Sequence, residues 1–86
     1  MPKVSEFYGI SIYFYHHDHA PPHFHARYAG VDAAFEIESL LVFEGQASPR
    51  VRRLVVEWAS DHREELRHVW EQARRGESLD RIPPLE

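Results

Sequence analysis

Residues 23–38 read HFHARYAGVDAAFEIE and contain two strand patterns around a turn. In residues 33–38 apolar side chains alternate with small or acidic ones, as in a strand with one buried face. Residues 23–28 form a second strand pattern, which places His23 and His25 on the same face. An Ala-Gly pair between the two patterns supplies the turn. This stretch therefore predicts two successive strands of an antiparallel sheet.

The sequence on both sides of this pair adds further strands. Residues 7–15 are rich in aromatic and β-branched side chains, and they predict a strand that precedes the pair. Residues 40–43 are apolar, and they predict either a fourth short strand or an apolar lead into a helix. Because sequential strands usually pair with their neighbours, the first half of the chain predicts an antiparallel meander of three to four strands.

Residues 49–75 carry the signals of a helix. Ser48 suits the N-cap, a proline follows it, apolar residues recur at 3.6-residue spacing, and Gly76 suits the C-terminal cap. Asp61 and Glu64 match a capping box, so a second helix that starts near this point is the alternative. We favour one long helix, straight or bent, because the apolar stripe is unbroken.

The expected fold class is α+β: a three- to four-stranded antiparallel meander followed by one long C-terminal helix that packs on one face. Residues 1–86 make a single domain, with an extended tail over residues 77–86. A chain of this length buries only a little over ~60% of the surface that its unfolded form exposes. Its stability is therefore modest, and a partner chain or a homo-oligomer is expected to support it.

Composition narrows the class of protein. The hydrophobic fraction of 43% and the aromatic fraction of 13% suit a folded chain rather than a disordered one. The sequence has no cysteine, which excludes disulfides and thiolate metal sites. It also has no signal-peptide core and no apolar run of membrane-spanning length, so we expect a cytoplasmic protein without a membrane partner. A net charge of −4 argues against general, charge-driven binding of nucleic acid.

Five of the seven histidines lie within residues 16–25, together with one aspartate and a Pro-Pro pair. His23 and His25 point the same way from a strand, while His19 and Asp18 precede them on a proline-stiffened connection. Imidazoles and a carboxylate suit a divalent transition metal: zinc, nickel, iron or manganese. The stretch therefore predicts a metal site at these four residues, and the bland alternative is a polar hairpin whose histidines bind backbone and water.

A second interpretation of the same strand needs no metal. His23, His25 and Arg27 share one face with Tyr13, and these side chains are the parts of a metal-independent ribonuclease site. Histidine would act as general acid or base, and Arg27 would hold a phosphate. The simpler alternative, a solvated sheet face, is the commoner one.

Arg50, Arg52 and Arg53 occupy the first turn of the expected helix, where cations oppose the helix dipole. Three of them together indicate an anionic target, which is either a phosphate or an acidic patch on a partner protein. The alternative is a solvated turn with local pairing, for example between Arg53 and Glu57.

Four motifs occur together along the chain: Phe7-Tyr8-Gly9-Ile10, Asp18-His19-x-Pro21-Pro22-His23-Phe24-His25-Ala26, Ile37-Glu38, and Glu57-Trp58-Ala59 followed by His62-Arg63-Glu64-Glu65-Leu66 and Trp70. In these motifs the chain resembles a small bacterial family, domain-of-unknown-function family four-one-six-zero. The resemblance covers essentially the whole chain. Its members are typically encoded beside a second small protein, of family two-four-four-two, in an arrangement similar to a type II toxin–antitoxin module.

The resemblance implies a component of a toxin–antitoxin-like pair, with a cognate small protein encoded nearby as partner. It implies no assigned catalytic residue. Our leading hypothesis is the toxin rather than the antitoxin, with the histidine stretch as a metal or ribonuclease-like site and RNA as a target. The alternative is a non-enzymatic interaction module, or the neutralising partner, with structural histidines.

Overall fold

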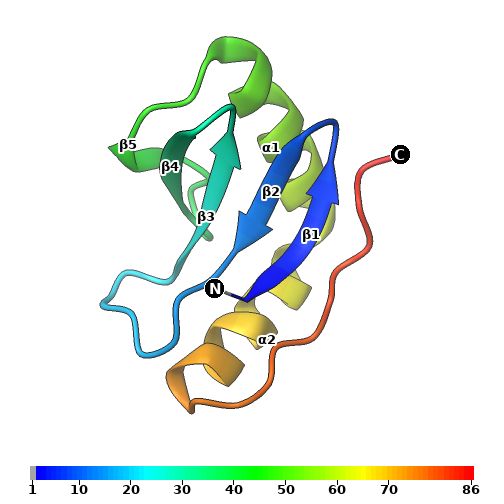
Figure 1. The fold of residues 1–86 in the computed structure, drawn as a ribbon. Coiled ribbons are helices and arrows are strands. Elements are labelled where there is room, and N and C mark those ends of the chain that lie inside the picture. Colours follow the sequence, from blue (N-terminus) through cyan, green and yellow to red (C-terminus); the bar gives the residue numbers. More distant parts are fainter. Residues whose placement is uncertain (1) are drawn as a thin grey trace.

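A five-stranded antiparallel sheet in the order β1-β2-β3-β4-β5 is followed by two helices in the computed structural model, which describes residues 2–86 (Figure 1). The elements have these bounds: β1 Lys3–Phe7, β2 Ile10–Tyr13, β3 His23–Tyr28, β4 Val31–Glu36, β5 Val42–Gly45, α1 Pro49–Asp61 and α2 Arg63–Arg74. In Figure 1, α1 lies behind the sheet and α2 continues below it. The protein is therefore an α+β domain built from an antiparallel meander and C-terminal helices.

The single strand expected over residues 7–15 is wrong, because the chain forms a hairpin there. Tyr8 and Gly9 have φ angles of 51° and 80°, and they join β1 to β2. Two consecutive residues with positive φ give the type I′ turn, whose twist matches that of paired strands. The expected strand merged β2 with the turn, and the strand before it was missed.

The connection between β4 and β5 also differs from expectation. The backbone N–H of Leu40 donates to the Glu36 carbonyl (2.7 Å), and the N–H of Glu36 donates to the Leu41 carbonyl (2.9 Å). Leu40 has a φ of 61°, so the chain turns at this residue and β5 begins at Val42. Together with β1, which the sequence pattern missed, β5 brings the sheet to five strands instead of three or four.

The single long helix is also wrong, because the helix is interrupted at His62. This residue has φ −126° and ψ 24°, and it separates α1 from α2. The alternative of a second helix is therefore confirmed, although its N-cap is His62, which makes no side-chain cap hydrogen bond, so the capping box at Asp61 is not what starts α2. The buried apolar residues continue in phase across the break, which hid it in the sequence. Neither helix in the described part of the chain is long and apolar enough to span a membrane.

Trp58 of α1 lies at the centre of the hydrophobic core. Its ring is fully buried, with centroids 5.2 Å from Phe7 and 6.0 Å from Phe24. Its indole Nε1–H donates to the carbonyl of Pro83 at 2.8 Å. The C-terminal tail therefore packs on the body of the protein, and the N–H of Ile82 donates to the Val4 carbonyl of β1 at 2.8 Å.

Replacing Gly45 by alanine should destabilise the fold far more than replacing Gly30. Both residues have positive φ (74° and 79°), so alanine strains either backbone by about 1–2 kcal/mol. At Gly45 a Cβ would also lie 2.2 Å from the Asp32 carbonyl oxygen, whereas nothing lies within 4 Å at Gly30. We expect about 1–3 kcal/mol of additional loss for Gly45→Ala in urea unfolding. Equal losses in the two variants would contradict the clash.

Candidate metal centre

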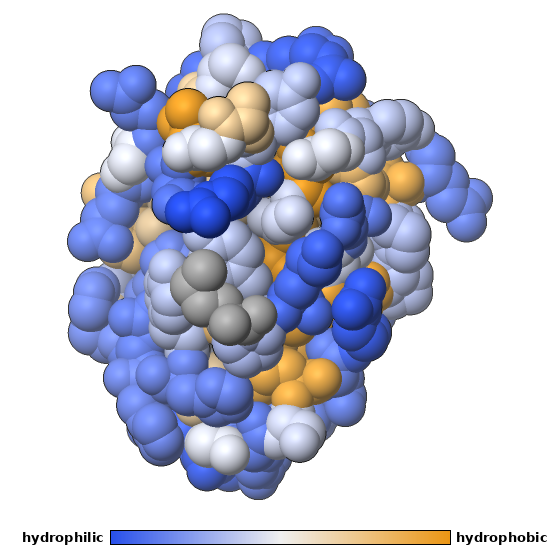
Figure 2. Space-filling view, in the orientation of Figure 1, coloured by the Kyte–Doolittle hydropathy of each residue, from blue (hydrophilic) through white to orange (hydrophobic). Residues whose placement is uncertain are grey.

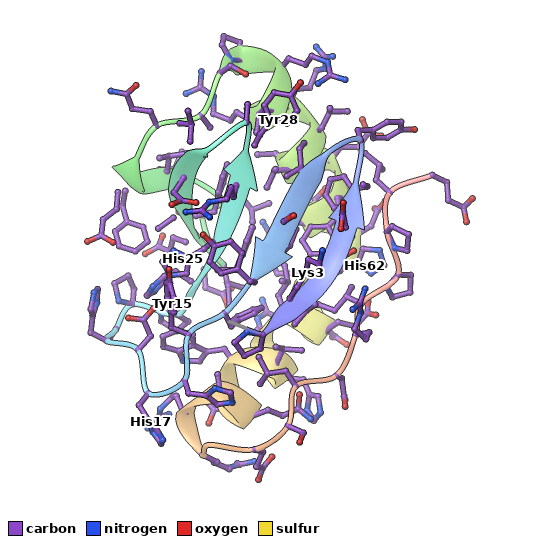
Figure 3. The ribbon with its side chains drawn as sticks, viewed as in Figure 1. Lys3, Tyr15, His17, His25, Tyr28 and His62 are labelled. Atoms are coloured by element: carbon purple, nitrogen blue, oxygen red, sulfur yellow. The ribbon has the colours of Figure 1, made fainter. Side chains whose placement is uncertain are left out.

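The histidine stretch forms the loop between β2 and β3, and it is fastened at several points. The N–H of His17 donates to the Ala73 carbonyl near the end of α2 (3.1 Å). The Nε2–H of His16 donates to the Glu77 carbonyl (2.9 Å), and the N–H of Ile37 donates to the Pro22 carbonyl (3.0 Å). Figure 3 shows His17 beside the C-terminal end of α2. These contacts give His16 and His17 a structural role.

One carboxylate oxygen of Asp18 brings two imidazoles together. Its Oδ2 lies 2.8 Å from Nε2 of His23 and 3.2 Å from Nε2 of His25. The ligand atoms of the three residues all lie within 4.8 Å of one another. All three side chains are largely buried, with exposed fractions of 14%, 0% and 13% for Asp18, His23 and His25. We refer to these residues as the Asp/His cluster.

His23 is the inner member of the Asp/His cluster. Its Nδ1 lies 2.6 Å from the Pro21 carbonyl, which can only accept, so Nδ1 carries a proton. The rings of Phe43 from β5 and Trp70 from α2 pack against it, with centroid distances of 5.1 and 5.2 Å. Neither aromatic residue was predicted to belong to the site. Both contact His23 only through tertiary packing, so no local sequence motif indicates them.

His25 is the outer member, and its side chain is 13% exposed, against 0% for His23. The ring of Tyr15 meets it edge-on at 4.5 Å, and the ring of Tyr13 stacks on it at 5.6 Å. Figure 3 shows His25 and Tyr15 side by side. A shallow depression of about 120 Å³ adjoins His25 and is also lined by Asp32 and Glu44. A small ligand can therefore approach the cluster past His25 but not past His23.

The carboxylate of Asp18 is held ionised by its neighbours. Burial raises its pKa, but hydrogen bonds from the His25 side chain, the His19 backbone and the His23 side chain outweigh burial, so that the pKa is lowered overall. The pKa of His19 is raised, first by its hydrogen bond to the Ala20 carbonyl and then by the charge of Asp18. The negative charge of Asp18 therefore favours a cation beside it.

Two residues of the expected site lie outside the cluster. The side chain of His19 is 65% exposed, and its Nε2 is 3.7 Å from Oδ1 of Asp18, so it flanks the cluster without joining it. Arg27 binds Asp32 through two hydrogen bonds of 2.9 and 3.0 Å. The structure thus brings together Asp18, His23 and His25 from the expected set.

The three arginines of α1 lie far from this loop. Arg50, Arg52 and Arg53 belong to the first turn and a half of α1, which begins at the opposite end of the sheet from the β2–β3 loop (Figure 1). They therefore take no part in the Asp/His cluster, and any anion that they bind is bound elsewhere.

The protein is a small α+β protein with an Asp/His cluster at one end of its antiparallel meander sheet. A family model described as "Domain of unknown function (DUF4160)" matches residues 9–71, which is more than half of the chain, and the chain belongs to this family. The resemblance seen in the sequence is thereby confirmed, and the matched region contains the whole cluster. Searches of the curated proteins and of the solved structures found no match.

Asp32 anchors a second polar group beside His25. The Tyr13 hydroxyl donates to Asp32 Oδ1 at 2.7 Å, in addition to the two bonds from Arg27. The bond from Arg27 and then that from Tyr13 lower the pKa of Asp32 below its ordinary value of 3.8. Burial and the same Asp32 contact raise the pKa of Tyr13. The guanidinium group of Arg27 is therefore already paired with the carboxylate of Asp32.

In the Asp32→Asn variant the melting temperature should fall less steeply with decreasing pH than in the wild type. Because the pKa of Asp32 is lower in the folded than in the unfolded chain, its stabilisation is complete above pH 3.8 and disappears as the pH falls through the folded-state value. Thermal unfolding between pH 7 and pH 2 measures this. Glu57→Gln, which removes the same charge from α1, is the matched control. A wild-type slope retained in Asp32→Asn would contradict the assignment.

Proposed function

We propose that this protein is a metal-dependent component of a bacterial toxin–antitoxin-like pair, and that Asp18, His23 and His25 hold one divalent transition metal. The observation that carries the proposal is the convergence of three ligand atoms within 4.8 Å. Two histidines and one carboxylate form the ligand set of many mononuclear metal sites with open coordination positions.

The distances in the Asp/His cluster support this proposal. Ligand atoms that lie about 2.1 Å from one ion are about 3.0 Å apart at right angles and about 3.4 Å apart at tetrahedral angles. The separations of Asp18 Oδ2 from the two imidazole nitrogens, 2.8 and 3.2 Å, are close to this range. Two of the three separations are therefore compatible with a shared ion, and all three ligand atoms lie within 4.8 Å of one another.

The environment of His23 supports the proposal independently. Metal-binding histidines usually donate their second ring N–H to a carbonyl or carboxylate, which fixes the tautomer. The Pro21 carbonyl holds the proton of His23 on Nδ1 and leaves Nε2 as the ligand atom. The aromatic rings of Phe43 and Trp70 exclude water from the inner side of this ligand.

A metal in this position would supply an activated water or a Lewis acid for hydrolysis. The substrate would approach past His25, where Tyr15 is partly exposed and the depression next to Asp32 and Glu44 begins. RNA is the substrate class we propose for the toxin, by the resemblance to toxin–antitoxin modules. The cognate protein encoded nearby would be its neutralising partner.

Wild-type protein should bind one equivalent of zinc, nickel, iron(II) or manganese, and His25→Ala and Asp18→Asn should each bind it at least roughly 10- to 100-fold more weakly. Calorimetry with the metal-free protein and elemental analysis of the purified protein measure this. His19→Ala is the control within the same loop, and it should retain wild-type affinity because His19 is not among the converging ligands. Unchanged binding by His25→Ala would exclude the proposed ligand set.

Expression of the wild-type protein alone should slow bacterial growth, and His25→Ala or Asp18→Asn should restore growth to the rate of an empty vector. His68→Ala is the control, since its exposed ring lies on α2 outside the cluster. Protein levels must be matched on a blot. If wild type and both cluster variants are equally toxic, the cluster has no part in the toxicity.

One observation favours the alternative function, a non-enzymatic interaction module. Both ring nitrogens of His23 face oxygen acceptors, Pro21 carbonyl and Asp18 Oδ2, an arrangement that an imidazolium ion satisfies without a metal. The cluster would then be a buried ion pair that fixes the loop. Purified protein free of metal, together with partner binding that His25→Ala leaves unchanged, would establish this alternative.

A further inference from the structure

An apolar groove lies at the opposite end of the sheet from the Asp/His cluster. Tyr28 and Val31, on either side of the β3–β4 turn, form one wall, and Ala47 and Val51 at the start of α1 form the other. The cavity measures about 360 Å³, which is at the small end of the range for ligand sites. No residue that lines it is charged.

The wall formed by Tyr28 and Val31 is accessible, whereas Val51 of the other wall is buried. Val31 is 52% exposed and Tyr28 is 39% exposed, and they are among the most exposed large apolar residues of the described chain. Val31 and Tyr28 are paired across β3 and β4, so the two side chains form one continuous patch. An exposed apolar patch next to a cavity is typical of a binding surface.

Three arginines flank Val51 of the second wall along the first turn and a half of α1. Arg50, Arg52 and Arg53 are exposed, and none of them forms an ion pair with any residue in the range 2–86. The first turn of α1 contains no acidic residue, so the helix dipole adds to this positive charge. Elsewhere in residues 2–86, Arg27, Arg67 and Arg74 are each paired with a carboxylate, whereas Arg63, Arg75 and Arg81 form no ion pair, so the distinguishing feature of α1 is that three such arginines lie within four residues. The pairing between Arg53 and Glu57 considered from the sequence is not formed.

We propose that this groove binds an acidic segment of a partner protein, with one large apolar side chain in the cavity and carboxylates against the arginines. The uncharged lining suits an apolar anchor, and the unpaired arginines suit the acidic residues that flank it. A nucleic acid would satisfy the arginines but would leave the exposed aliphatic side chain of Val31 without a matching surface. The assignment of this groove does not depend on the Asp/His cluster.

A peptide titration followed by NMR tests the proposal on the full chain. The probe is the acetylated and amidated peptide Glu-Asp-Leu-Trp-Glu-Asp, and the control peptide has serine in place of Leu and Trp. The acidic apolar peptide should shift backbone amide signals in residues 26–31 and 46–53 and leave those of residues 18–25 unchanged. The control peptide should bind at least roughly fivefold more weakly, since it lacks the anchor.

Two variants separate the apolar and the electrostatic contributions. Val31→Asn removes the apolar side chain from the exposed wall without adding a charge, and Arg52→Glu reverses one charge beside the groove, so each should weaken the peptide roughly tenfold. Arg81→Glu makes the same charge change in the tail and should leave the affinity unchanged. Because the changed residues are exposed, all three variants should fold, which a wild-type amide spectrum outside the changed region would verify.

Three outcomes would overturn the proposal. The first is the absence of shifts in the groove at millimolar peptide. The second is equal binding of the serine control peptide, which would make the contact purely electrostatic. The third is a single-stranded RNA oligonucleotide that shifts the same amides, binds more tightly than the peptide and is insensitive to Val31→Asn, which would identify a nucleic-acid surface. None of these outcomes bears on metal binding by the Asp/His cluster.

Discussion

The structure of the β2–β3 loop depends on one carboxylate oxygen, Oδ2 of Asp18, which contacts two imidazoles at once. A buried histidine is costly unless its polar atoms have partners. His23 is fully buried between Phe43 and Trp70, and it is tolerated there because Asp18 and the Pro21 carbonyl face its two ring nitrogens. The same oxygen holds His25 at the solvent side. Loss of this carboxylate would leave both rings without their common partner.

Because the helix is interrupted at His62, its two halves pack against different parts of the protein. α1 packs Trp58 into the centre of the core, whereas α2, after the break, presents Trp70 to His23. The last turn of α2 also provides the Ala73 carbonyl that accepts from the His17 backbone. α1 therefore packs on the core and α2 on the β2–β3 loop. A single straight helix would extend away from the sheet.

The candidate sites lie at opposite ends of one rigid sheet, and they differ in chemistry. In the orientation of Figure 1, the surface in Figure 2 is mostly hydrophilic, with apolar residues between the hydrophilic ones. The Asp/His cluster offers carboxylate and imidazole ligands for a cation, and the groove at α1 offers cationic side chains around an apolar cavity. A partner in the groove would leave the approach past His25 open. Binding of a partner and chemistry at the cluster can therefore be studied separately.

Local patterns were sufficient to predict the α+β class, the antiparallel meander, the N-cap of α1 at Ser48 and the set of residues from which the cluster is drawn. These features follow from local patterns: alternation, capping and the placement of His23 and His25 on one strand face. Tertiary structure decided the rest. The break at His62 interrupts no hydrophobic pattern, so periodicity could not reveal it. The turn at Tyr8 and Gly9 shifts the alternation, because Phe7 and Ile10 are both buried, and only that shift and the glycine mark it in the sequence. The choice of Asp18 over His19 as the companion of the two histidines, and the contacts of Phe43 and Trp70 with His23, depend on how loop, sheet and α2 pack together, because only packing decides which side chains of a polar loop point inward.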